Sequence, residues 1–114
     1  MIILDLKAVE LPNVNDRYKK GFYLSETYKI RKESLREHIE YNCKGMKKIK
    51  PPYSVNIMVG THYDIDNFLK PLFDAMQKSG VIDNDKNIEK LTVEKATLGR
   101  NQQNWITVTL IGEI

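Results

Sequence analysis

Four stretches of the chain have the hydrophobic pattern of β-strands. In the first two, every second residue is apolar, which is the period of a strand buried on one face. The predicted strands cover residues 2–10, 53–59, 91–98 and 105–111. Only the polar segment 99–104 separates the last two runs, so we expect them to form an antiparallel hairpin.

Two further stretches have apolar residues at helical spacing. The first predicted helix covers residues 26–43, and Ser25 is a suitable N-cap for it. The second covers residues 67–79 and stops at Gly80, a common C-terminal signal. The element order is therefore β-α-β-α-β-β. It predicts the α+β class, with two layers in which two helices pack on one four-stranded mixed sheet.

The length and composition narrow the class of protein. With 114 residues the chain can bury one hydrophobic core, so we expect a single domain over residues 1–114. No segment has the roughly 18–20 consecutive apolar residues that a membrane span needs, and the N-terminal residues have no signal-peptide pattern. We therefore expect a cytoplasmic protein with no membrane partner. The single Cys43 excludes an intrachain disulfide and a cysteine-type zinc site.

The net charge of +3 is unevenly distributed along the chain. Residues 17–50 contain eleven Lys or Arg and four Glu, whereas residues 1–16 and 51–114 each carry a net charge of −2. A basic segment of this size suits a polyanion such as DNA, although lysines on a helix are more often a solvated face. Charge alone leaves both interpretations open.

Acidic residues gather around the second predicted helix. Asp64 and Asp66 are separated by one residue just after a strand, so in an extended chain their carboxylates point to the same side. Asp66, Lys70 and Asp74 follow at four-residue spacing, which places them on one helix face. Capping of the helix and a plain ion-pair ladder are the structural alternatives.

The loop after this helix adds Asp83 and Asp85. In a polar turn these acids need no further role. If the loop returns to the strand end, however, several carboxylates converge and repel each other unless a cation neutralises them. Oxygen ligands with open positions suit Mg²⁺, or Mn²⁺, better than zinc. Such ions can activate water and stabilise a leaving 3′-oxygen, so the cluster indicates phosphodiester hydrolysis.

Taken in order, these residues resemble the RusA family of Holliday-junction resolvases. The matching residues are Asp64-Ile-Asp66-Asn67-x-x-Lys70-x-x-x-Asp74-Ala75, Gly80-Val81-Ile82 and Asp85, with an upstream Pro12-x-x-Asn15-x-x-Tyr18. The resemblance implies a small, dimeric, Mg²⁺-dependent endonuclease that nicks four-way DNA junctions symmetrically, in recombination or repair. By motif position, Asp64, Asp66 and Asp85 match the metal-binding catalytic aspartates, and Lys70 matches the catalytic lysine. The family often has two adjacent acids where this chain has Asn84-Asp85, so Asp83 stays an alternative third ligand.

Basic and aromatic residues are the candidates for DNA contact. Those near residue 18 interleave positive charge with aromatic rings, a mixture suited to phosphate contact and base stacking, although aromatic loop residues often pack under a sheet. The candidates are Asn15, Arg17, Tyr18, Lys19, Lys20, Lys29, Lys32, Lys47 and Lys48. His62 is better explained as a surface or packing residue than as a base. We expect Trp105 in the core or at a dimer interface.

Two rival functions remain at this point. One is a non-catalytic DNA-binding module in which the acids serve as caps and solubilising charge. The other is a metal nuclease that acts on other branched DNA. Retention of Asp64, Asp66, Asp85 and Lys70 argues against the non-catalytic module, whereas the sequence does not separate the other nuclease from a junction resolvase. The first interpretation follows the family resemblance, which implies a homodimeric, metal-dependent endodeoxyribonuclease acting on four-way junctions.

Overall fold

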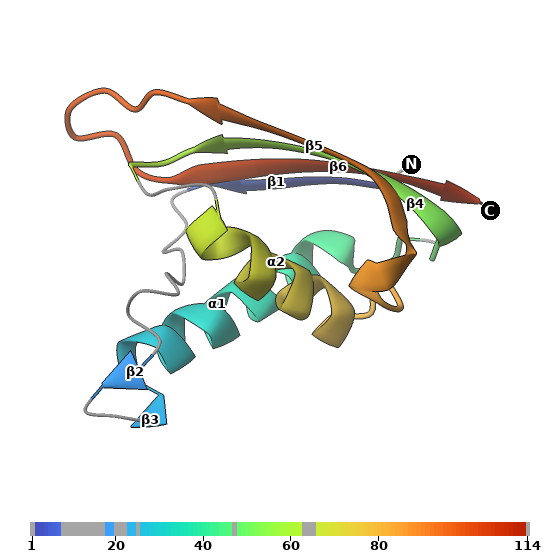
Figure 1. Cartoon of the computed structure of the whole chain (residues 1–114), viewed down its shortest axis with the longest axis horizontal. Coiled ribbons are helices and arrows are strands. Elements are labelled where there is room, and N and C mark those ends of the chain that lie inside the picture. Colours follow the sequence, from blue (N-terminus) through green and yellow to red (C-terminus); the bar gives the residue numbers. More distant parts are fainter. Residues whose placement is uncertain are drawn as a thin grey trace.

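The computed structural model describes residues 2–7, 18–19, 23–24, 26–46, 48–62 and 66–113, with the backbone alone for residues 7, 18–19, 23–24, 66–67 and 113. Its elements are β1 (Ile2–Lys7), β2 (Tyr18–Lys19), β3 (Tyr23–Leu24), α1 (Glu26–Cys43), β4 (Lys50–Gly60), α2 (Asp66–Lys78), the 3₁₀ turn η2 (Asp85–Asn87), β5 (Ile88–Ala96) and β6 (Trp105–Glu113). Both helices lie on one face of the main sheet (Figure 1). The predicted α+β class, two layers and element order are confirmed.

The main sheet has the strand order β1-β6-β4-β5. β6 pairs antiparallel with both β1 and β4, whereas β5 pairs parallel with β4. The sheet is therefore mixed, as predicted, but the expected antiparallel hairpin between the last two strands is wrong. β6 takes a central place because Ile106, Val108 and Leu110 are fully buried, while most of β5 is exposed and suits an edge.

The core lies between the sheet and the two helices. Alternate residues of β1, β4 and β6 point toward the helices, and the strand period predicts this burial. On the helix side, α1 contributes Tyr28, Leu35 and Ile39, and α2 contributes Phe68, Leu72 and Met76. These helical residues follow the spacing from which both helices were predicted.

The helix boundaries agree closely with the prediction. α1 has the predicted range, and α2 begins and ends one residue earlier than predicted. Gly80 follows α2 with φ of 82°, and Val81 N–H donates to the Met76 carbonyl at 3.0 Å, which closes the helix end. Ser25 and the end of the first predicted strand, residues 8–10, lie outside the described residues.

Two smaller differences concern the strands. β4 begins at Lys50, three residues before the predicted start, and β2 and β3 form a short antiparallel ladder where a loop was expected. Trp105 is half-buried on the face away from the helices, so the expected core position is wrong. Its ring covers Gly60 so closely that a Cβ added there would overlap the indole. Of the helices described, none is long and apolar enough to cross a membrane.

Candidate active site

The two acids of the Asp-x-Asp pair stand where β4 leads into α2. Asp66 is the first residue of α2 and is described by its backbone, and Asp64 lies outside the described residues. The helical backbone places Asp66 one turn before Lys70 on the same side of α2.

Lys70 contacts two carboxylates from different parts of the chain. Its Nζ lies 3.2 Å from Asp74 Oδ1, one turn along α2, and 3.6 Å from Asp85 Oδ2, in η2. The predicted ion pair within the helix is therefore present. The structure also brings the later acid of the motif to Lys70, although fifteen residues separate the two in sequence.

The backbone of Asp85 is held by α2 itself. Asp85 N–H donates to Gln77 Oε1 at 3.2 Å. Two residues earlier, Asp83 N–H donates to the hydroxyl of the buried Tyr53 in β4 at 3.3 Å. These two bonds tie the loop after α2 to the helix on one side and to the sheet on the other.

The carboxylates of Asp83 and Asp85 have different surroundings. Asp83 Oδ1 accepts from Asn84 N–H at 2.6 Å and from Asn87 Nδ2 at 3.0 Å, inside its own loop. The bond from Asn87 is the main reason that the pKa of Asp83 lies below its ordinary value. Asp85 instead faces Lys70 with 31% of its side chain exposed. Of the two acids, Asp85 is therefore the one directed at the α2 residues of the motif.

Lys70 is a stable positive charge in this arrangement. The hydrogen bond to Asp74 and the negative charges of Asp74 and Asp85 raise the pKa of Lys70 above its ordinary value. The side chain is still 63% exposed, so its ammonium group can reach a ligand in solution. A protonated amine of this kind can neutralise phosphate charge, but it cannot accept a proton.

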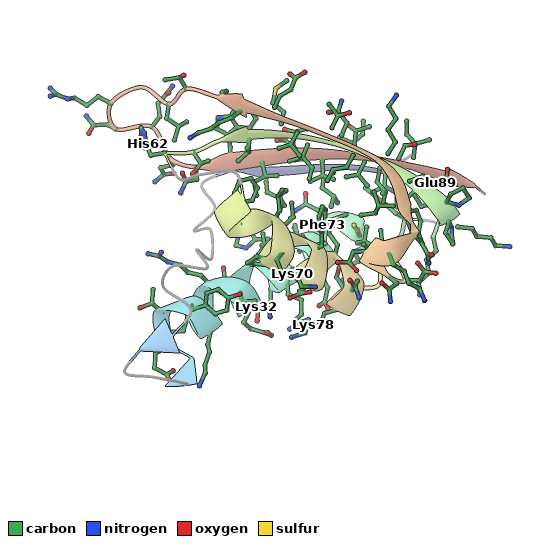
Figure 2. All side chains as sticks on the ribbon, in the orientation of Figure 1. Lys32, His62, Lys70, Phe73, Lys78 and Glu89 are labelled. Carbon is green, nitrogen blue, oxygen red and sulfur yellow. The ribbon has the colours of Figure 1, made fainter. Side chains whose placement is uncertain are left out.

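Asp74 also links α2 to α1. Its Oδ2 lies 3.5 Å from Lys32 Nζ, which in turn lies 5.9 Å from the centre of the Tyr28 ring. Figure 2 shows Lys32 and Lys70 on neighbouring helices, below the sheet. Lys32 was predicted as a DNA contact from its charge, and its ammonium group is held against Asp74 here.

The sequence analysis missed the two residues that hold the loop with Asp83 and Asp85 in place. Tyr53 was interpreted only as a strand residue, and Gln77 was not singled out. Gln77 stands three residues after Asp74, so the helical face that carries Lys70 and Asp74 extends to it. That spacing was the available signal. No local pattern relates Tyr53 to Asp83, which lies thirty residues away.

The remaining basic candidates fall into two groups. Asn15, Arg17, Lys20 and Lys47 lie outside the described residues, and the backbones of Tyr18 and Lys19 form β2. Lys29 is exposed on α1, 3.7 Å from Glu26, and Lys48 is exposed just before β4. His62 is exposed after β4, apart from Lys70 in Figure 2.

Helix α1 itself carries no excess of positive charge. It contains four Lys or Arg and four Glu, so the basic excess of residues 17–50 comes from the segments 17–20 and 44–50. The helix between them has 18 residues and is therefore about 27 Å long. Lys32, which contacts Asp74 of the site, stands between its two ends. In sequence, the two basic segments therefore stand on either side of α1, whose Lys32 contacts Asp74. We refer to Asp64, Asp66, Asp74 and Asp85 as the acidic group.

The donor set suits a hard divalent cation. Asp64, Asp66 and Asp85 offer only carboxylate oxygens, the ligand type that Mg²⁺ and Mn²⁺ prefer. Among the side chains that the structure describes, no three His, Cys, Asp or Glu form a metal-binding group; of these three acids, Asp64 lies outside the described residues and Asp66 is described by its backbone alone. The three aspartates therefore fit Mg²⁺ or Mn²⁺ by the chemistry of their oxygen atoms and by their order in the sequence.

Comparison with known proteins identifies the family. Comparison with curated proteins gives no match. The family model described as endodeoxyribonuclease RusA matches residues 9–110, which includes every residue of the acidic group and both helices. Because the match spans most of the 114 residues, the chain belongs to the RusA family of Holliday-junction-resolving endodeoxyribonucleases.

Proposed function

We propose that this protein is a metal-dependent nuclease that resolves four-way DNA junctions, with Asp64, Asp66 and Asp85 as ligands of Mg²⁺ or Mn²⁺. The contact between Lys70 and Asp85 carries the proposal, because it joins the α2 part of the motif to the loop part. A bound divalent ion would supply an activated water and charge neutralisation at the phosphate. The other residues of the chain then have to bind the DNA phosphate next to the three aspartates.

Lys70 has the charge and exposure for phosphate contact. A lysine is protonated at neutral pH, and Asp74 and Asp85 raise the pKa of Lys70 further, so it acts as a fixed cation beside the scissile phosphate and not as a general base. Asp74 orients it from one turn away, and Lys32 balances the second oxygen of Asp74. This pairing leaves Lys70 turned toward Asp85.

The proposed DNA surface uses the basic segments on either side of α1. Residues 17–20 contain Arg17, Lys19 and Lys20, and residues 44–50 contain Lys47 and Lys48. Phosphate contacts from such residues make affinity strongly salt-dependent and carry little sequence information. Lys29 adds an exposed charge on α1, whereas the ammonium group of Lys32 is paired with Asp74.

The substrate also argues for two copies of the chain. A four-way junction has two symmetry-related strands to cut, and one chain of 114 residues offers one acidic group. A two-fold dimer would supply two groups with matching symmetry. Mixing wild type with excess Asp66→Asn should then give heterodimers that nick one strand only.

The direct test compares two neighbouring aspartates. Asp85→Asn should abolish cleavage of a labelled four-way junction in Mg²⁺ and leave its binding intact, because the side chain keeps its volume but loses an anionic ligand. Asp83→Asn is the matched control and should keep most of the cleavage activity. A linear duplex and EDTA serve as substrate and metal controls. Wild-type binding without cleavage in either Mg²⁺ or Mn²⁺ would favour a non-catalytic DNA-binding module.

A further inference from the structure

Strand β5 is an exposed edge of the sheet, and its sequence is complementary to itself. It pairs with β4 on one side, and none of the described strands pairs with its other side (Figure 1). Its nine residues read Ile-Glu-Lys-Leu-Thr-Val-Glu-Lys-Ala, with Thr92 at the centre. Read against its own reverse, this sequence sets each acid opposite a base and each apolar residue opposite another.

We propose that two copies of this chain associate by antiparallel pairing of β5 with β5, centred on Thr92. The proposal deepens the proposed function, which requires two copies on one junction, by naming the contact surface. The opposed residues would be Lys90 with Glu94 and Leu91 with Val93, each pair occurring twice, with Thr92 opposite itself. The pairing joins two four-stranded sheets into one continuous sheet.

The faces of the strand agree with this register. β5 lies beside β4 with Leu91 next to the buried Val55, and Lys90 next to Ser54 on the other face. From Lys90 onward, odd-numbered residues of β5 therefore face the helix layer and even-numbered residues face away from it. Before Lys90 a bulge shifts the register, so Ile88 lies beside the buried Tyr53 and packs against the core. In the proposed pairing, odd residues oppose odd and even oppose even, as an antiparallel sheet requires. Leu91, which is 43% exposed in one chain, gains Val93 of the second copy as an apolar neighbour.

Neighbouring registers lose this complementarity. A shift of the two-fold centre to Leu91 sets Glu89 against Val93, and a shift to Val93 sets Leu91 against Lys95. Charged residues on edge strands often serve to prevent pairing. Protection of that kind needs charge but no particular order, whereas the order in β5 matches opposite charges in one register only.

The proposed dimer keeps the two candidate sites on one side. A two-fold axis perpendicular to the sheet places both helix layers on the same face. η2 leads directly into β5, so the Asp85 of each copy lies next to the paired strands and on the helix side, where Lys70 is. One DNA junction could then face both acidic groups.

A charge swap tests the pairing without DNA or metal. In a homodimer, Lys90→Glu sets a new acid against Glu94 of the second copy, and Glu94→Lys sets a new base against Lys90. Each variant should dimerise about tenfold or more weakly than wild type in sedimentation equilibrium, since two attractive cross-strand pairs become repulsive. An equimolar mixture should associate more tightly than either variant alone, because the heterodimer has opposite charges in contact at both pairs. Both residues are exposed, so the fold should be unaffected.

A control variant and a cross-link complete the test. Glu37→Lys, an exposed reversal on α1, should leave dimerisation unchanged. In a Cys43→Ala background, Thr92→Cys should form an oxidised dimer, because the two-fold axis sets residue 92 opposite itself, whereas Thr109→Cys on β6 should not. A mixture that associates no better than either variant alone, a monomeric wild type, or cross-linking through Thr109→Cys would each overturn the β5 interface. Junction cleavage is measured separately, so the nuclease proposal can stand when this one fails.

Discussion

The hydrogen bond from Asp85 N–H to Gln77 Oε1 should control how well the proposed third metal ligand is positioned. Gln77→Met removes the acceptor and keeps an unbranched side chain of similar length and similar helix propensity. Nothing else on the α2 face that carries Lys70 and Asp74 is altered. The variant therefore isolates one positioning contact of the loop.

The expected loss of stability is small. Leaving the half-buried amide of Asp85 without this acceptor costs about 1 kcal/mol, which lowers Tm by about 4 °C in a chain of this size. The expected loss of function is larger, because residues that orient a metal ligand typically contribute about 10–100-fold to metal affinity or activity. We expect the Mg²⁺ concentration for half-maximal cleavage to rise about tenfold, with part of the rate recovered at high Mg²⁺.

The measurements are junction cleavage across a Mg²⁺ titration and thermal unfolding in EDTA. Gln102→Met is the matched control, because Gln102 Oε1 accepts a bond from Gly99 N–H in the loop between β5 and β6. It removes the same kind of bond in a loop that contains none of the motif acids. If Gln77→Met unfolds earlier but keeps the wild-type Mg²⁺ dependence, the bond is only structural and the reasoning about Asp85 is refuted.

Three further predictions use other contacts of the fold. Lys70→Ala should lose most cleavage but bind a junction almost as well as wild type in fluorescence anisotropy, because one phosphate contact changes the salt slope by only about one unit; a tenfold loss of affinity would contradict this. Gly60→Ala should lower the free energy of unfolding by about 1–3 kcal/mol, because its Cβ overlaps the Trp105 ring. The same change should cost little in a Trp105→Ala background, and equal costs in both backgrounds would exclude the overlap as the cause. Asn87→Ala should destabilise the fold near pH 7, because the pKa of Asp83 is held below its ordinary 3.8 in the folded state and its contribution is present above that value. The contribution is lost as the pH falls through the lowered folded pKa, so the difference from wild type in chemical unfolding should shrink below about pH 4; a constant difference would exclude the carboxylate as the partner.

The sequence by itself determined the helices, the location of most strands and the residues of the acidic group. α1 and α2 were predictable because burial on one face imposes a period on residues that are close in sequence. Lys70 and Asp74 were predictable as a pair for the same reason, since residues four apart on a helix are neighbours. The order of acids and glycine around α2 also identified the family, and the family match over residues 9–110 confirms it.

The tertiary structure decided which strands pair and which acid faces Lys70. A strand's own pattern shows that one face is buried but does not name the neighbour, so β6 was not expected between β1 and β4. Asp83 and Asp85 stand in one polar loop, and no local pattern separates them. The bonds that Asp83 N–H and Asp85 N–H donate to Tyr53 and Gln77 fix how that loop turns. This directs the Asp85 carboxylate to Lys70 and leaves that of Asp83 with Asn87. Both the strand pairing and the contact of Asp85 with Lys70 depend on segments that are far apart in sequence. Which of the possible contacts form is decided only when the whole chain packs.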